Sequence, residues 1–231
     1  MFGVEVCDMV IHPFKDKVLF VDLDNTLYSD GLGVSDMMSK RIVEFLVERC
    51  NLTEGEAETK AHEYYLQYGL SAVGIIKAHQ IDPSEYDKLV DGSLPLESIL
   101  SQDYNLKSIL RCCQARKWVF TNAGKFHAER VLNILGIQNE FEGIVYCDYS
   151  MQDIICKPDP ASFHRAQKLA GVVVPGNCYF IDDSMANVEA AHRLGWHAAL
   201  VRFDQPSCYP KGVVQKVHEL PFVFPELFLP N

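Results

Sequence analysis

The chain has 231 residues, of which 48% are hydrophobic and 23% charged, a composition typical of a globular protein with enough apolar side chains for a core. Its formal net charge of −10 argues against a nucleic-acid partner, because such a partner requires a basic face. The 8 cysteines include no Cys-x-x-Cys pair, which argues against a zinc site, and several lie in apolar runs, as expected in a reducing cytosol.

We find no targeting pattern in the sequence. Residues 1–8 carry acid early and lack both a basic stretch and a long apolar stretch, so they do not match a signal peptide. No window is apolar over the length of a membrane-spanning helix. We therefore expect a cytoplasmic protein, with a nuclear location left open, and no membrane partner. The oligomeric state is not predicted.

Two acidic residues follow the first predicted strand. Residues 18–21 (VLFV) form an apolar, partly β-branched run that predicts a buried strand, and Asp22 and Asp24 come after it. Because side chains alternate along a strand, we expect the two carboxylates on the same side, close enough to share a cation. A hard divalent ion with oxygen ligands, Mg²⁺, would remove their repulsion.

Residues 27 to about 104 predict helices and no strand. Apolar residues recur at helical spacing between residues 37 and 46. Thr53 and Glu56 match a capping box for a helix that ends at Gly69, and residues 71–79 predict a short apolar helix. Residues 82–85 open another helix, with Pro83 in its first turn. An all-helical block directly after the first strand predicts a cap over the site.

From residue 106 onward, strands and helices alternate. Strands are expected at Trp118–Asn122, Gly143–Cys147, Tyr179–Asp182 and His197–Phe203. Helices, each followed by a glycine stop, are expected at Phe126–Leu135, Ala161–Leu169 and Ala186–Leu194. The alternation predicts an α/β protein whose parallel sheet is covered on both faces. The tail at residues 220–228 is apolar but broken by proline, so we expect it to cross the surface without regular structure, with an interface role as the alternative.

Three further polar groups lie where a parallel sheet would gather them. Thr121-Asn122 ends one strand, Lys157-Pro158 lies on a loop, and Asp182-Asp183-Ser184 ends a later strand. Parallel strands place their carboxyl ends on one edge, so these side chains can meet in one crevice. The order Asp-x-Asp-x-Thr, Thr-Asn, Lys-Pro, Asp-Asp resembles the four motifs of the haloacid-dehalogenase (HAD) superfamily of phosphohydrolases, over about residues 17–203.

This resemblance implies a HAD-like Rossmannoid core at residues 1–30 and 104–231, with a helical cap at residues 31–103. In such an enzyme Asp22 attacks the phosphorus of a phosphomonoester, and water hydrolyses the resulting aspartyl-phosphate. Asp24 protonates the leaving oxygen and then takes a proton from water, and its backbone carbonyl also reaches the metal. Lys157 neutralises charge on the transferring phosphoryl group. Thr121 binds a phosphate oxygen, helped by the amides of Asn122 and Ala123.

The remaining candidates surround this centre. Asp183 is the expected inner ligand of Mg²⁺, and Asp182 would act through a water or from outside the ligand shell. Asn187 either supports that loop or is exposed in a first helical turn, while the Thr26 hydroxyl is expected to bond the backbone of its turn. His127 is expected to be an exposed helical residue or else to contact a substrate oxygen. Tyr65, Tyr68 and His79 could stack on a base or ribose or else pack in the core.

The cap run 64–70 (YYLQYGL), with residues 120–123, 146–149 and 180–184, is similar to the pyrimidine 5′-nucleotidase branch of the superfamily, and most to its fungal members. The implied substrate is a pyrimidine nucleoside 5′-monophosphate such as UMP or CMP, in nucleotide metabolism. Lysophosphatidate, an activity assigned to a related fungal member, or a broad range of nucleotide and sugar phosphates is the alternative. Asp24 together with Asp183 argues against a haloacid dehalogenase. A phosphomutase, which also uses Asp-x-Asp, and a non-enzymatic binding module with this fold stay open as well.

Overall fold

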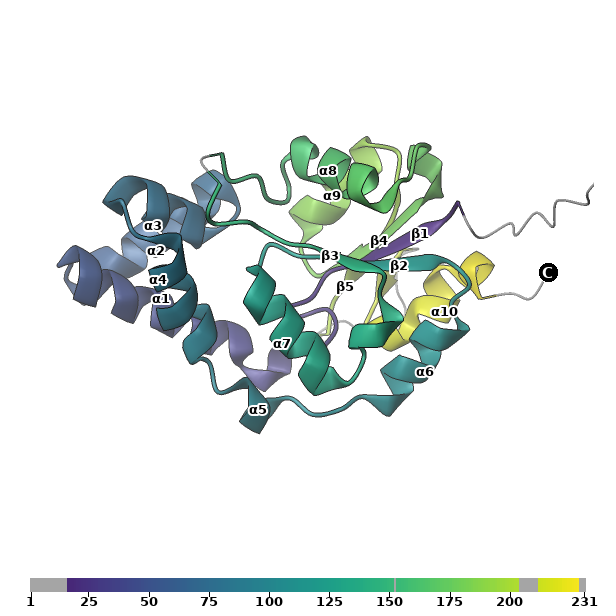
Figure 1. Ribbon diagram of the computed structural model, residues 1–231, viewed down its shortest axis with the longest axis horizontal. Helices are drawn as coiled ribbons and strands as arrows, with labels where there is room; N and C mark the ends of the chain where they lie inside the picture. Colours follow the sequence, from purple (N-terminus) through teal and green to yellow (C-terminus); the bar gives the residue numbers. More distant parts are fainter. Residues whose placement is uncertain (1–15, 152, 204–211, 229–231) are drawn as a thin grey trace, which may run out of the picture.

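One parallel sheet forms the centre of the molecule (Figure 1). The computed structural model describes residues 16–151, 153–203 and 212–228, so the segment without a signal-peptide pattern lies outside the described residues. The strands are β1 (Val18–Val21), β2 (Arg116–Phe120), β3 (Gly143–Val145), β4 (Cys178–Asp182), β5 (His197–Val201) and β6 (Val213–Val214), in the order β3-β2-β1-β4-β5-β6. Within these residues, no helix has the length and apolar character needed to cross a membrane.

Strand β1 is buried on both faces, as its continuous apolar run predicts. Val18 and Phe20 belong to a cluster with helices α8 (Pro160–Ala170) and α9 (Met185–Arg193). Leu19 and Val21 belong to another cluster with α6 (Tyr104–Cys112), α7 (Lys125–Leu135) and α10 (Leu220–Val223). Figure 1 shows these two groups of helices on opposite sides of the sheet. The predicted α/β architecture, with helices on both faces, is therefore confirmed.

The predicted strands and helices are all present, with small shifts at their ends. Strand β2 ends at Phe120, so Thr121 and Asn122 follow the strand instead of lying in it. The three helices predicted after residue 106 correspond to α7, α8 and α9. Strand β6 was not predicted, because two residues are too short to show a periodicity.

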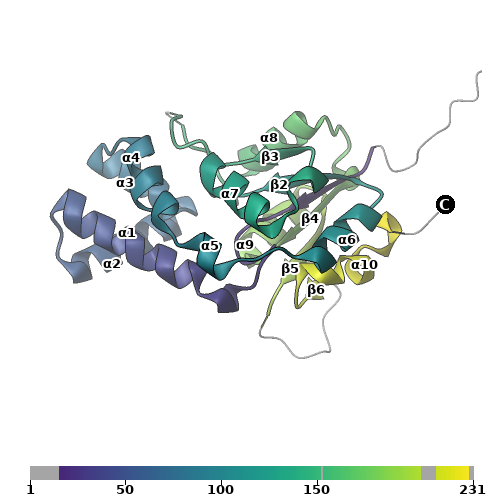
Figure 2. The same ribbon diagram turned by 60° about the horizontal axis from the view of Figure 1, so that its bottom comes forward.

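Along the chain, β1 is followed by a block of four helices: α1 (Val34–Cys50), α2 (Glu54–Tyr68), α3 (Ser71–His79) and α4 (Pro83–Leu89) (Figure 2). They share an apolar cluster that includes Phe45, Ile75 and Tyr86, and Cys147, Tyr149 and Cys156 from the segment after β3 belong to it as well. The predicted capping box of α2 is present. Beyond α4, a short 3₁₀ turn, η2 (Asp91–Ser93), and α5 (Leu96–Ile99) lead back, and Leu96 already packs in the main core. The boundary at residue 103 stays a prediction.

The C-terminal segment was wrongly predicted to lack regular structure. Helix α10 and a 3₁₀ turn at Pro225–Leu227 each carry proline in the first turn, where it starts a helix rather than interrupts one. Leu220 and Leu227 are fully buried in the main core. The N–H of Gln114 also donates to the Leu227 carbonyl at 2.8 Å. The tail is therefore an integral part of the core.

Candidate active site

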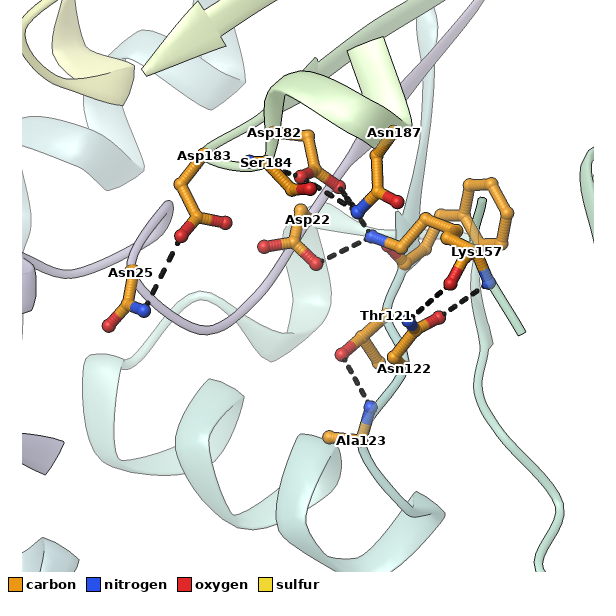
Figure 3. Close-up of polar contacts among 11 residues, drawn as sticks. Asp22, Asn25, Thr121, Asn122, Ala123, Lys157, Asp182, Asp183, Ser184 and Asn187 are labelled. Atoms are coloured by element: carbon orange, nitrogen blue, oxygen red, sulfur yellow. Dashed lines mark hydrogen bonds and ion pairs between the residues drawn. The ribbon is translucent and has the colours of Figure 1, made fainter. Parts of the chain in front are cut away.

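Three carboxylates gather at the carboxyl edge of the sheet (Figure 3). Asp22 follows β1, Asp182 ends β4 and Asp183 follows it; one oxygen from each lies within 4.8 Å of the others. Asp22 and Asp183 line a cavity of about 1160 Å³ that residues of the helical block also line. The expected sharing of a cation by the carboxylates of Asp22 and Asp24 is not found, because the Asp24 side chain points toward Tyr28 and His127. After β1 ends at Val21, strand alternation no longer sets the side-chain direction.

Lys157 is buried among these carboxylates, only 1% exposed, although it lies on a loop. Its Nζ donates to Asp22 Oδ1 at 2.7 Å, to Asp182 Oδ2 at 2.6 Å and to the Phe120 carbonyl at 2.7 Å. Burial lowers the pKa of the ammonium group, but the charges of Asp182 and Asp22 outweigh burial, so the net shift of its pKa is upward. Lys157 is thus a fixed positive charge beside Asp22.

The Asp182 carboxylate is already saturated with donors from the protein. Besides Lys157, the Asn187 amide donates to both of its oxygens at 3.0 and 3.1 Å, and the Ser184 N–H donates to Oδ1 at 2.8 Å. An oxygen that accepts so many hydrogen bonds is a poor direct metal ligand, which agrees with the outer position expected for Asp182. Of the two predictions for Asn187, the structure favours support of this loop, since the residue is 8% exposed.

Asp22 and Asp183 keep carboxylate oxygens for a cation. Asp22 Oδ2 accepts no hydrogen bond from the described residues. The side-chain donor to Asp183 is Asn25, at a long 3.4 Å. Burial and the neighbouring Asp182 raise the pKa of Asp183 to about 6, and burial also raises the pKa of Asp22. Lys157 supplies one positive charge to the three carboxylates of Asp22, Asp182 and Asp183, and the free oxygens of Asp22 and Asp183 are hard donors, so the donor set fits Mg²⁺.

Asn25 was not predicted from the sequence. It adopts the left-handed conformation, with φ of 58°, and its Oδ1 accepts a hydrogen bond from Ser35 Oγ at 2.9 Å. Asparagine tolerates this conformation better than most residues, so an Asn in the turn after β1 was the available signal. Its neighbour Thr26 does not behave as expected: the hydroxyl is buried and has no hydrogen-bond partner in the described part of the chain. The Thr26 side chain therefore does not bond the backbone of its turn.

The loop after β2 holds Lys157 in place. Asn122 Nδ2 donates to the Lys157 carbonyl and Asn122 Oδ1 accepts from the Lys157 N–H, both at 2.8 Å. Thr121 is buried and lines the cavity, but its Oγ1 accepts the Ala123 N–H at 3.0 Å. The predicted use of the Ala123 amide for phosphate is therefore not found in this arrangement. The side chain of Asn122 is also bound to Lys157 instead of being directed at a phosphate.

Asp24 is held by two donors. Tyr28 donates its hydroxyl to Asp24 Oδ1 at 2.5 Å, and His127 Nε2 lies 2.7 Å from the same oxygen. Burial raises the pKa of Asp24, but the charge and hydrogen bond of His127 bring it below its ordinary value. Burial lowers the pKa of His127, yet Asp24 raises it to about 9. The expectation that His127 is an exposed helical residue is wrong, because the residue is only 3% exposed.

Known proteins match this chain in sequence and in fold. A family model described as haloacid dehalogenase-like hydrolase matches residues 17–195. The chain belongs to this family. Phosphate metabolism protein 8 from Saccharomyces cerevisiae is 36% identical over 214 residues, which cover 88% of this chain and 67% of that protein.

Two solved structures show the same fold as this hydrolase. A HAD phosphatase from Thermococcus onnurineus has a TM-score of 0.63 and 17% identity, covering 92% of this chain and 100% of that chain. L-2-haloacid dehalogenase from Xanthobacter autotrophicus has a TM-score of 0.59 and 16% identity, covering 90% of this chain and 98% of that chain. At these identities the likeness shows the fold alone.

The cap of this hydrolase contributes aromatic side chains to the cavity. Tyr65 and Tyr68 of α2 line it together with Asp22, Asp24 and Asp183. His79 does not line it; instead its Nε2 lies 3.0 Å from the Tyr64 hydroxyl within the cap. Of the three residues predicted to stack on a base or ribose, Tyr65 and Tyr68 therefore line the cavity and His79 does not.

Proposed function

We propose that the protein is a Mg²⁺-dependent phosphatase that hydrolyses phosphomonoesters through an aspartyl-phosphate on Asp22. The observation that carries this proposal is the arrangement of Asp22 at the cavity: Lys157 holds Oδ1, while Oδ2 accepts no hydrogen bond from the described residues. A carboxylate that is anchored by a fixed cation and lines a cavity is well placed to attack phosphorus.

The residues around Asp22 suit the two steps of this reaction. In the first step a carboxylate oxygen of Asp22 bonds to phosphorus, the ester bond breaks, and Asp24 gives a proton to the leaving oxygen. In the second step Asp24 takes a proton from the water that attacks phosphorus and releases Asp22. A bound phosphate would add negative charge near Asp24 and so favour its protonated form. Lys157 offsets the charge that develops on the phosphoryl oxygens.

Asp22 and Asp183 would hold the Mg²⁺, with Asp182 outside the ligand shell. The ion would neutralise negative charge and orient the phosphate. Asn187 and Ser184 would keep Asp182 fixed behind Lys157, and Asn25 would steady Asp183. Their role is to keep the acidic groups in place whether or not a substrate is bound.

For the substrate we propose a pyrimidine nucleoside 5′-monophosphate. Support comes from the resemblance of the cap run 64–70 to the pyrimidine 5′-nucleotidase branch. It also comes from Tyr65 and Tyr68, which line the cavity and carry rings of a kind that can stack on a base. The cavity, about 1160 Å³, is far larger than a phosphate and admits a whole nucleotide. The name of the relative, Phosphate metabolism protein 8, is consistent with a substrate that carries phosphate. Lysophosphatidate is the second candidate, since the cavity also has apolar lining residues such as Met38, Ile42 and Val73.

A substrate panel tests the proposal. Phosphate release is measured with Mg²⁺ from p-nitrophenyl phosphate, each 5′-mononucleotide, the 3′-isomers and lysophosphatidate at matched concentrations. We expect UMP and CMP to be preferred, and Asp22→Asn to be inactive while still folded. No phosphate release from any ester would contradict the phosphatase, and chloride release from a haloacid without Mg²⁺ would favour a dehalogenase. Phosphate returned to the substrate instead of to water would indicate a mutase.

A further inference from the structure

The Asp24 carboxylate is held at one oxygen only. The Tyr28 hydroxyl and His127 Nε2 both contact Oδ1, at 2.5 and 2.7 Å. None of the described residues donates a hydrogen bond to Oδ2. The side chain is 32% exposed and lines the cavity with Asp22. This arrangement fixes the plane of the carboxyl group and leaves Oδ2 without a protein donor at a residue that lines the cavity.

His127 is itself rigidly placed. It lies in the first turn of α7, its side chain is fully buried, and within the described chain its Nδ1 has no hydrogen-bond partner. Among the described residues, the imidazole therefore forms its hydrogen bond through Nε2, to Asp24. Buried polar groups are normally hydrogen-bonded, so the single hydrogen bond of this buried ring points to a role for its contact with Asp24.

The cap contributes charge near the start of α7. Asp87 of α4 and Asp91 of η2 lie over its first turn, since a Cβ atom on Gly124 would be 3.1 Å from Asp87 Oδ1 and 3.6 Å from Asp91 Oδ2. One turn after His127, Arg130 donates to the carbonyls of Gly92 and Leu94 at 3.3 and 2.8 Å. Helix α7 therefore contacts Asp24, where the chain leaves the core, and residues 92–94, where it returns from the cap.

We propose that His127 is a positioning residue for Asp24: it holds Oδ1 so that Oδ2 faces the ester oxygen of the substrate. The inference rests on the proposed phosphatase function and adds to it a residue that works through Asp24 without touching the substrate. Tyr28 shares the task, but it lies on the same connection as Asp24, only four residues later. His127 comes from a different element and so ties Asp24 to the body of the core.

A positioning role predicts a dependence on the leaving group. An alkoxide leaving group needs a proton from Asp24 as the ester bond breaks, whereas p-nitrophenolate is a stable anion and leaves without one. The ratio kcat/KM reports only the steps up to release of the alcohol, before water attacks the aspartyl-phosphate. Loss of the His127 contact should therefore lower kcat/KM for alkyl esters selectively. It should lower kcat for both kinds of ester, because Asp24 also activates the water.

The experiment compares two esters in the full-length protein with Mg²⁺: p-nitrophenyl phosphate and the alkyl phosphate that the wild type hydrolyses fastest. For His127→Ala we expect kcat/KM to fall about 10²-fold for the alkyl ester and less than about threefold for the aryl ester, the lower end of general acid–base effects. His127→Gln, which keeps a donor, should recover part of the alkyl-ester loss. In an Asp24→Asn background, His127→Ala should add little further loss.

Val131→Ala is the matched control, because Val131 is a fully buried residue one turn further along α7. It should reduce stability without changing the ratio between the two esters. Equal losses for both esters in His127→Ala and His127→Gln would overturn the positioning role, as would a full additional loss in the Asp24→Asn background. Absence of phosphate release from both esters in the wild type would instead refute the proposed function itself.

Discussion

The side chain of Asn122 bonds both backbone groups of Lys157, donating to its carbonyl and accepting from its N–H, each at 2.8 Å. Asn122 follows β2, and Lys157 lies 35 residues later on a loop. The pair of bonds lets a loop residue place its ammonium group between Asp22 and Asp182. The Asn122 amide thus holds the backbone of Lys157, which lies outside regular secondary structure.

Asn122→Ala should misplace Lys157. Two part-buried hydrogen bonds are lost, so we expect a decrease of about 1–3 kcal/mol in the free energy of unfolding. We also expect kcat/KM for p-nitrophenyl phosphate to fall about tenfold or more, because small displacements of a catalytic group are costly. Urea unfolding and steady-state kinetics measure the two effects. Asn122→Asp retains the acceptor for the Lys157 N–H but not the donor, and should lie in between; wild-type activity in Asn122→Ala would contradict this role.

Lys157→Met keeps the length of the side chain and removes its charge. Asp22 and Asp182 would then face each other without a counter-charge, so we expect a loss of about 3–5 kcal/mol in the free energy of unfolding and of nearly all activity. Urea unfolding followed by circular dichroism measures the first effect. The control is Lys125→Met, since Lys125 is 52% exposed and should contribute less than about 0.5 kcal/mol. Similar stability in the two variants would show that Lys157 is not a buried counter-charge.

Asp91 should make stability depend on pH. Burial raises its pKa to about 7, against about 3.9 in an unfolded chain, while the charge of His127 opposes the shift. Between these values the folded state binds more protons than the unfolded state, so this contribution to stability is present at low pH and is lost as the pH rises toward 7.

Asp91→Asn stays neutral at every pH and should therefore be more stable than the wild type at pH 8, on the order of a few kcal/mol, and less different at pH 5. Urea unfolding at the two pH values provides the comparison. The control is Asp36→Asn, which removes one carboxylate from an exposed position in α1. An Asp91→Asn profile parallel to that of the wild type would exclude this contribution.

Metal removal should stop the reaction. We expect EDTA to inactivate the protein, Mg²⁺ to restore activity, and Ca²⁺ to substitute poorly because its larger, looser coordination shell misplaces the phosphate. Asp183→Ala should weaken Mg²⁺ binding, as measured by the Mg²⁺ concentration needed for half-maximal phosphate release. An unchanged Mg²⁺ titration in this variant would refute the ligand role of Asp183.

The sequence predicted those parts of the site that depend on strand ends. Asp22, Asp182 and Asp183 each lie at or just after the carboxyl end of a buried strand, and a parallel sheet brings such ends to one edge. Lys157 could be assigned only through the resemblance, because nothing in a loop lysine predicts burial. The same reasoning explains the shared-cation error at Asp24, since strand alternation was extended past the end of β1.

Contacts between distant segments could not be predicted. The His127–Asp24 bond joins residues 103 positions apart, and the helical pattern around His127 is equally compatible with an exposed ring. The Asn122–Lys157 bonds likewise depend on how two loops meet. In the tail, proline is compatible both with a break and with the start of a helical turn. Each of the two prolines starts a turn, and the packing of Leu220 and Leu227 in the core, which depends on distant segments, accompanies these turns.

The central claim is that the Asp22 carboxylate itself accepts the phosphoryl group. Turnover with p-nitrophenyl phosphate and Mg²⁺ is quenched with acid, the protein is reduced with borohydride, and peptides are sequenced by mass spectrometry. Borohydride converts an aspartyl-phosphate to homoserine, so the account predicts homoserine at position 22, dependent on substrate and absent in Asp22→Asn. Homoserine at another aspartate, or none at position 22 while the protein turns over, would contradict it.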